Sequence, residues 1–96
     1  MDGSKNIFEQ WGTFTGRPIK EKVIILKYLR GFKPSWVTSG VVVDRVINQP
    51  IKKHYNVGYE YDGFTWNQEH IYHFEKYDMP LKQEFINHVL SSRGKT

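Results

Sequence analysis

The chain contains no cysteine, and this absence removes several kinds of protein at once. Without thiols it can form no disulfide framework, no thiolate metal site and no cysteine nucleophile. Long apolar runs are missing too, because the longest unbroken aliphatic run, residues 23–26, is far shorter than the ~20 residues that cross a membrane. The first residues lack the basic-then-apolar order of a signal peptide, and the second residue is not the glycine that myristoylation needs. We therefore expect a soluble, cytoplasmic protein that does not associate with membranes.

Signatures of nucleotide-dependent chemistry are also absent. Residues 12–16 carry two glycines but lack the Lys-Ser/Thr pair that ends a phosphate-binding loop, and the chain has no Gly-x-Gly-x-x-Gly pattern. No serine lies in a nucleophile-elbow pattern. No repeat, low-complexity tract or linker divides the sequence. We expect a single small domain over residues 1–96 that uses no cofactor.

Aromatic rings and positive charge are what the chain has in excess. Six Tyr, six Phe and three Trp make up 16% of the residues, and so short a chain needs large rings to fill its core. The net charge is +4, but residues 1–53 hold ten basic and four acidic side chains, whereas residues 54–96 hold four and six. A basic half suits an acidic partner such as nucleic acid or an acidic protein surface, and it also suits simple solubility.

The N-terminal segment, residues 1–18, is weakly patterned and is expected to form an arm. Within it, Ile7, Phe8, Trp11 and Phe14 follow helical spacing. This spacing predicts a short helix over residues 5–11 that ends at a glycine.

Two strands separated by a loop are expected next. The β-branched run at residues 23–25 favours a strand over residues 19–30, although good helix formers on either side leave a helix open there. Glycine and proline at residues 31–35 indicate a loop. A second strand over residues 36–48 would place valines on one face and polar residues on the other.

The clearest pattern in the chain lies at residues 51–61, where apolar and polar residues alternate. Such alternation is typical of a half-buried antiparallel strand. Asp62 and Gly63 signal a tight turn because glycine accepts positive φ, so a short strand over residues 64–66 should return. Together these segments predict an antiparallel sheet of three or four strands over residues 19–66.

Two helices are expected after the sheet. Residues 67–77 fit a helix capped by Asn67 better than a strand, although both stay open. An apolar stripe at helical spacing predicts a helix over residues 80–92, with Asp78 and Pro80 at its start. The fold class is therefore α+β, a three- to four-stranded antiparallel meander with a C-terminal amphipathic helix packed on one face.

Histidines supply the candidates for chemistry. On a helix, His70 and His73 lie one turn apart and could share a metal ion, but no pattern supplies a third ligand. On a strand, Glu69, His73 and Glu75 would share a face and could serve a small His-dependent nuclease as general acid and base. Neither pattern is specific, so we expect no metal, assign no catalytic residue and do not expect an enzyme.

A nucleic-acid-binding domain is the first alternative. The loop from Arg30 to Trp36 places two cations beside two aromatic rings, which could meet phosphates and stack on bases. Lysines upstream of this loop could extend a groove. The candidate residues are Lys20, Lys22, Lys27, Arg30 and Lys33.

Binding of a protein partner is the leading hypothesis. The chain has more rings in or beside its predicted loops than a helix-on-sheet core needs, and large aromatic residues are enriched at interfaces. The competing explanation is a core in which the N-terminal arm wraps around the sheet. The interface candidates are Trp11, Phe14, Phe32, Trp36 and Tyr77. We expect a small non-enzymatic protein that binds and modulates or inhibits a protein, of the immunity-protein, antitoxin or phage-modulator type.

Overall fold

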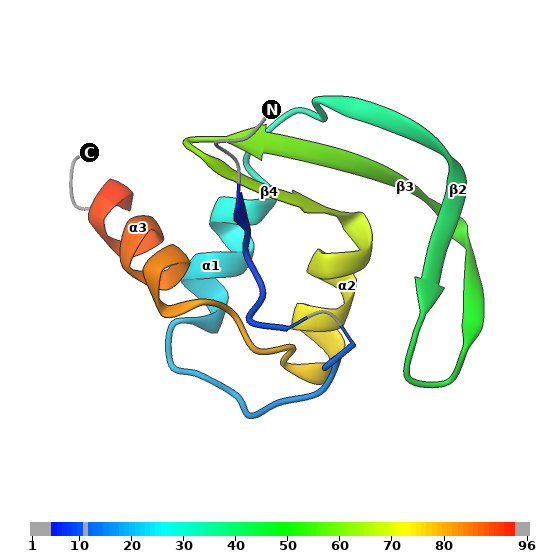
Figure 1. The fold of residues 1–96 in the computed structure, drawn as a ribbon, viewed down its shortest axis with the longest axis horizontal. Helices are drawn as coiled ribbons and strands as arrows, with labels where there is room; N and C mark the ends of the chain where they lie inside the picture. The colour runs from blue at the N-terminus through cyan, green and yellow to red at the C-terminus, as the bar shows by residue number, and fades with distance from the viewer. Residues whose placement is uncertain (1–4, 11, 94–96) are drawn as a thin grey trace.

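The computed structural model describes residues 5–10 and 12–93 and has the α+β fold that the sequence predicts. Three helices lie on one side of a four-stranded sheet (Figure 1). In chain order the elements are β1 (Lys5–Asn6), α1 (Lys22–Leu29), β2 (Trp36–Asp44), β3 (Gln49–Tyr61), β4 (Phe64–Asn67), α2 (Gln68–Tyr77) and α3 (Gln83–Arg93). Within these described ranges, no helix combines the length and the apolarity that crossing a membrane requires.

The sheet is mixed, so the prediction of a simple meander is corrected. The strand order is β1-β4-β3-β2, and β2, β3 and β4 pair antiparallel as a meander. β1, however, runs parallel to β4, with Lys5 opposite Phe64. The sheet thus takes one edge from the N-terminal segment, and its meander begins at residue 36 rather than at residue 19.

The N-terminal segment is extended, so the helix predicted over residues 5–11 is wrong for the residues described there. The Lys5 N–H donates to the Gly63 carbonyl, and Phe8 forms an isolated antiparallel bridge with Leu81. Ile7 and Phe8 are both buried. Neighbouring segments on both sides satisfy the backbone of this extended chain, which outweighs the local helical spacing. Trp11 lies outside the described residues.

The strand predicted over residues 19–30 is also wrong, because this segment forms α1. Ile25 and Leu29, one helical turn apart, are completely buried, whereas Val23 is 78% exposed. Burial therefore follows the helical period and overrides the strand preference of the β-branched run. α1 packs against α2 and α3.

Two local predictions are confirmed where the chain leaves the sheet. Asp62 and Gly63 adopt φ angles of 54° and 83°, as a tight hairpin turn between β3 and β4 requires. The Asn67 side chain accepts the His70 backbone N–H, and His70 Nδ1 accepts the Asn67 N–H. This reciprocal cap starts a helix, so residues 68–77 are α2 rather than a strand.

The C-terminal helix is present but begins at Gln83, later than predicted. Asp78 does not start it; Asp78 ends α2 as a left-handed cap with φ of 59°. Leu81 is held in the bridge to Phe8, and the Lys82 N–H donates to the Ile7 carbonyl. The connection between α2 and α3 therefore lies beside the N-terminal segment and cannot join the helix.

Aromatic rings fill the core between the sheet and the helices. Trp66 is buried in β4, and its ring stacks on Tyr59 with centroids 5.6 Å apart. Phe85 of α3 approaches the same indole at 6.1 Å, and Phe32 meets it edge-on at 5.7 Å. Burying each such side chain contributes roughly 2 to 3 kcal/mol, so these rings supply much of the driving force for folding.

Candidate functional site

The hairpin of β2 and β3 extends beyond the rest of the sheet. Pairing of β3 with β4 ends at Gly58, so residues 36–57 form a two-stranded ribbon. From here on we call this ribbon the arm; it is a different segment from the N-terminal arm expected over residues 1–18. Figure 1 shows the ribbon curving around the end of the sheet and down beside α2. Its register shifts between Val37 and Val41 and again before Val42, and such irregularities bend a ribbon.

Exposed apolar side chains gather on the arm. Val37 and Tyr55 are 74% and 69% exposed. Because opposed residues and alternate residues of antiparallel strands share a face, the pairs Val37–Val57 and Val41–Tyr55 place these four side chains together as what we call the arm patch. Val37 and Tyr55 are its exposed members, whereas Val41 and Val57 are half-buried and Val57 also packs against the core. Among the described residues, the other large apolar side chains that are exposed are Val23, Trp36, Val46, Ile47 and Leu90. Trp36, Val46 and Ile47 also belong to the arm.

Trp36 lies over a glycine at the base of the arm. It is paired with Gly58, and a Cβ added at that glycine would collide with the indole ring. The indole therefore takes the space that a side chain on β3 would otherwise occupy, which covers a bare stretch of backbone. Trp36 remains 42% exposed, so part of its ring is still available to a partner.

A buried carboxylate fastens the tip of the arm to α2. Asp44 is completely buried, and its Oδ2 accepts the hydroxyls of Tyr72 at 2.5 Å and Tyr77 at 2.6 Å. Its Oδ1 accepts the backbone N–H groups of Val46 and Ile47. Burial alone would raise the pKa of the Asp44 carboxyl, but these four hydrogen bonds outweigh burial and hold the pKa well below its usual value. Asp44 is therefore a structural anion.

Two further side chains of α2 cover the outer edge of β2. Glu69 Oε2 accepts the Val43 N–H at 3.2 Å, and His73 Nε2 accepts the Arg45 N–H at 2.8 Å. His73 Nδ1 lies 2.6 Å from the Glu69 carbonyl oxygen, so Nδ1 is the donor in this contact. These side chains take the place that a neighbouring strand would fill and close this part of the edge to pairing. We call Asp44, Glu69, Tyr72, His73 and Tyr77 the clasp.

The histidines that the sequence offered as metal ligands or catalytic groups are engaged in the clasp and in the α2 cap. Both ring nitrogens of His73 are engaged, and His70 Nδ1 is used in the α2 cap. Burial, and then the neighbouring His73, lower the pKa of His70 to about 3. Within residues 5–10 and 12–93, no group of three His, Asp or Glu side chains is placed to hold a metal ion. Glu69 and His73 share a helix face but are buried, and Glu75 turns to Arg30 instead, so the proposed strand face does not form.

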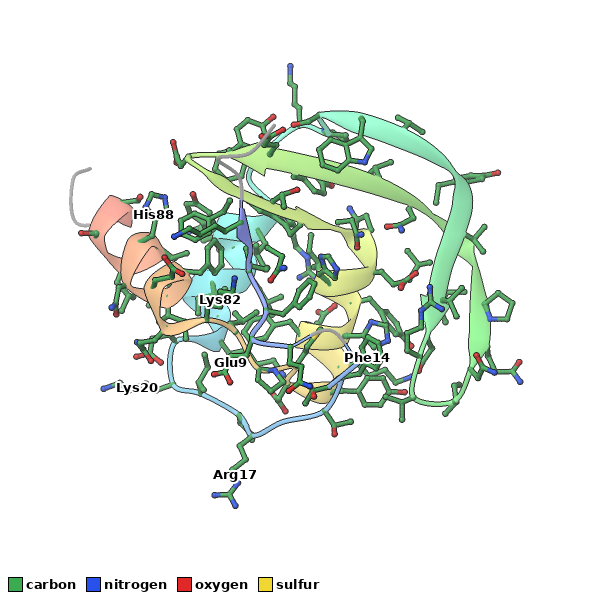
Figure 2. All side chains as sticks on the ribbon, viewed as in Figure 1. Glu9, Phe14, Arg17, Lys20, Lys82 and His88 are labelled. Carbon is green, nitrogen blue, oxygen red and sulfur yellow. The ribbon has the colours of Figure 1, made fainter. Side chains whose placement is uncertain are left out.

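The predicted interface aromatics do not form one patch. Phe14 packs on the clasp histidine with ring centroids 4.9 Å apart and points toward α2 (Figure 2). Phe32 stacks on a tyrosine of β3, and Tyr77 belongs to the clasp. Trp36 lies at the base of the arm with part of its ring exposed, and Trp11 is outside the described residues.

The predicted nucleic-acid residues divide into two groups. Lys22 and Arg30 form ion pairs with carboxylates at 2.7 Å and 2.5 Å. Lys20, Lys27 and Lys33 are exposed, and none of the ion pairs of the described residues includes them. Lys20 points into solvent ahead of α1 (Figure 2), whereas Lys33 follows the end of that helix. The free lysines are thus spread along α1 rather than gathered in a groove.

A second polar cluster joins three distant segments. His88 Nε2 of α3 lies 3.2 Å from the Tyr28 hydroxyl and 3.4 Å from Asp62 Oδ2 (Figure 2 labels His88). Burial, and then the charge and hydrogen bond of Asp62, raise the pKa of Tyr28 to about 12. The Tyr28 hydroxyl therefore stays protonated and donates to Asp62. This cluster ties the β3–β4 turn to α1 and α3.

Sequence reasoning missed the arm patch and the clasp. Tyr55 lies on the alternating face of residues 51–61 that was expected to be buried, yet it is exposed because the arm extends past β4. Asp44 stands on the polar face of its predicted strand, and nothing local indicates that Tyr72 and Tyr77 meet it. The buried carboxylate and the exposed apolar ribbon can be recognised only when the position of α2 beside the arm is known.

Comparisons with known proteins find no relative. No protein-family model matches the chain, and no curated protein or solved structure matches it either. Function is therefore inferred from the residues and geometry described above.

Proposed function

We propose that this chain is a small non-enzymatic protein that binds a partner protein through its arm. The observation that carries the proposal is the exposure of Val37 and Tyr55 on one face of a projecting ribbon. Exposed apolar side chains that gather on one element favour an interaction site, whereas scattered ones are ordinary. Trp36 at the base of the arm adds the type of aromatic side chain that carries binding energy at interfaces.

The chemistry of the arm favours a protein over a nucleic acid. The guanidinium of Arg45 is already paired with Glu69 at 2.8 Å, and the Asp44 charge is enclosed by donors. The exposed lysines Lys20, Lys27 and Lys33 lie on and around α1 rather than on the arm. Phosphate contacts need clustered cations, and the arm patch supplies apolar area.

A protein that binds without catalytic groups changes the activity of its partner by covering part of the partner's surface. We therefore extend the proposal to modulation or inhibition of that partner, in the manner of an immunity protein, an antitoxin or a phage-encoded modulator.

The test is affinity capture from source-cell lysate with and without nuclease, followed by binding measurements on the purified partner. Val37→Asp and Tyr55→Asp each place a charge in the arm patch, and Val23→Asp makes the same change on exposed α1. We expect both arm variants to weaken binding by at least about tenfold while Val23→Asp binds normally, since a charge in an interface core costs several kcal/mol. Circular dichroism checks that all three remain folded.

Two outcomes would contradict the proposal. Equal binding by wild type and both arm variants would remove the arm patch from the interface. Loss of every captured protein after nuclease treatment, with an affinity that falls steeply with salt, would instead assign function to the exposed lysines around α1.

A further inference from the structure

β2 is the last strand of the sheet, so only one of its two edges pairs with another strand of the described residues. On the outer edge, two side chains of α2, Glu69 and His73, accept backbone N–H groups. Both contacts lie at the end of the strand, with residues 43 and 45. In Figure 1 only the end of β2 lies beside α2, whereas its first part forms the upper margin of the molecule. We call the outer edge of residues 36–41, which precede these contacts, the upper edge.

The bulky side chain at the start of β2 turns away from the upper edge. The Trp36 indole lies over Gly58, and this glycine belongs to β3, on the other edge of β2. Val37, the next residue, is 74% exposed. The N–H and C=O groups along a sheet edge are a template for another extended chain, so the occupant that matches the upper edge is a β-strand.

The sequence of β2 lacks the residues that usually protect an edge strand. Residues 34–43 form the longest stretch of the chain without Asp, Glu, Lys or Arg. β2 contains no proline, and its four valines and one threonine favour extended backbone. Edge strands are ordinarily kept from pairing by charged side chains, above all lysine, and by proline. The upper edge carries neither.

A second copy of the chain meets the requirements of this edge. Two copies of an uncharged strand pair antiparallel without bringing like charges together. Such pairing has a two-fold axis perpendicular to the sheet, and two-fold symmetry is the commonest in oligomers. The register shifts bend the arm toward the helix-covered side of the sheet (Figure 1), and this axis gives both copies the bend in the same sense. The curvature of the two strands therefore matches.

We propose that this chain forms a dimer in which the upper edges of two copies pair antiparallel and join their sheets into one. The inference goes beyond the proposed function and needs no partner protein. Because the axis is perpendicular to the sheet, both copies present the same face on the same side. Val37 and Tyr55 of each copy then lie on one continuous apolar surface. The contact is limited to residues 36–41, so we expect the weak, concentration-dependent association of a small interface.

Sedimentation equilibrium of the purified chain tests for the dimer. Concentrations from about 10 µM to about 1 mM cover the Kd values of weak interfaces. The expected result is a reversible shift from the mass of one chain to that of two. Amide hydrogen exchange over the same range locates the contact, because strand pairing should slow exchange at residues 36–41 as concentration rises. Packing of the arm patches face to face would give a dimer without this protection.

A matched pair of variants separates the upper edge from the rest of the surface. Val37→Lys places a charge on this edge, and Val23→Lys makes the same change on α1. The two valines are 74% and 78% exposed, so both variants should fold, and both raise the net charge equally. Val37→Lys should weaken dimerisation by at least about tenfold because like charges meet across the interface, whereas Val23→Lys should leave it unchanged. Circular dichroism checks the fold, and hydrogen exchange of the wild type decides if Val37→Lys does not fold.

Three results overturn the dimer: the mass of one chain up to about 1 mM, a dimer that folded Val37→Lys leaves intact, or a dimer without protection of residues 36–41. A chain that stays monomeric alone and gains this protection only with its captured partner would assign the upper edge to a strand of the partner. The dimer is measured without a partner, so its absence leaves the proposed function standing. Loss of arm-dependent capture equally leaves the dimer standing.

Discussion

The helix-covered part of the sheet and the arm are held in place by different forces. Around Trp66 the structure excludes large rings from water, with Tyr59 and Phe85 as the nearest partners. The arm meets α2 through a network of polar contacts with a buried carboxylate at its centre. Apolar burial is spread over many contacts, whereas a polar network fails when one member is removed. The arm should therefore loosen separately from the core, and the exposed patch lies on the element that is fastened independently.

The largest effect is expected in the core. Trp66→Ala removes the indole that packs on both Tyr59 and Phe85, and a cavity of that size costs about 3 to 5 kcal/mol. Urea unfolding should show a single transition at much lower denaturant, with the arm and the core losing structure together. A variant that keeps wild-type stability would show that the aromatic cluster is not what stabilises the fold.

Breaking the clasp should lower the free energy of unfolding by less than Trp66→Ala does, and its effect should be confined to the arm. Asp44→Ala leaves the hydroxyls of Tyr72 and Tyr77 and two backbone N–H groups without their acceptor, at a cost of about 2 to 3 kcal/mol. Hydrogen exchange should accelerate at residues 42–50 and remain slow at residues 59–67. Uniform acceleration over both ranges would show that the arm and the core unfold as one unit.

Acid should destabilise the protein through His70. Its folded pKa of about 3 lies below the unfolded value near 6.5, so the unfolded chain binds more protons between these values and stability falls as pH decreases. By pH 5 the loss should reach about 2 kcal/mol, measured by urea unfolding at several pH values. His70→Gln, which can still accept the cap hydrogen bond, should remove most of this slope. An unchanged slope in His70→Gln would assign the acid sensitivity to another group.

The smallest effect is expected at the base of the arm. Gly58→Ala forces Trp36 off its position and should cost about 1 kcal/mol, because the indole is partly exposed and can move. Gly40→Ala is the matched control, since a Cβ added at Gly40 meets nothing within 4 Å. Tryptophan fluorescence should change in Gly58→Ala alone. Equal responses of the two variants would show that Trp36 does not rest on this glycine.

The parts of the fold that follow from local chemistry were predictable from the sequence. The positive φ available at Gly63 and the capping capacity of Asn67 each act within a few residues, and both are realised. α1 was mistaken for a strand because β-branched residues at 23–25 suggest one, whereas burial of Ile25 and Leu29 against other helices decides the outcome. Asp78 was assigned to the wrong helix end because a left-handed cap and an N-terminal cap use the same residue types.

The candidate site was less accessible because it depends on long-range placement. Asp44 meets Tyr72 and Tyr77 only when the arm bends, and the bend comes from register shifts that no residue pattern marks. Tyr55 has the same alternation as the buried Tyr59, and the two differ because β4 ends at Asn67, opposite Gly58, and so does not reach Tyr55. Of the predicted interface aromatics, Phe14 and Phe32 instead form packing contacts with other rings of the fold.

The most direct test of the arm as the recognition surface is an amide chemical-shift map of the labelled chain with its captured partner. The account predicts the largest changes at residues 36–57, with little change at residues 22–29 of α1. Changes centred on residues 20–33, with residues 36–57 unaffected, would contradict it and place recognition on the exposed lysines.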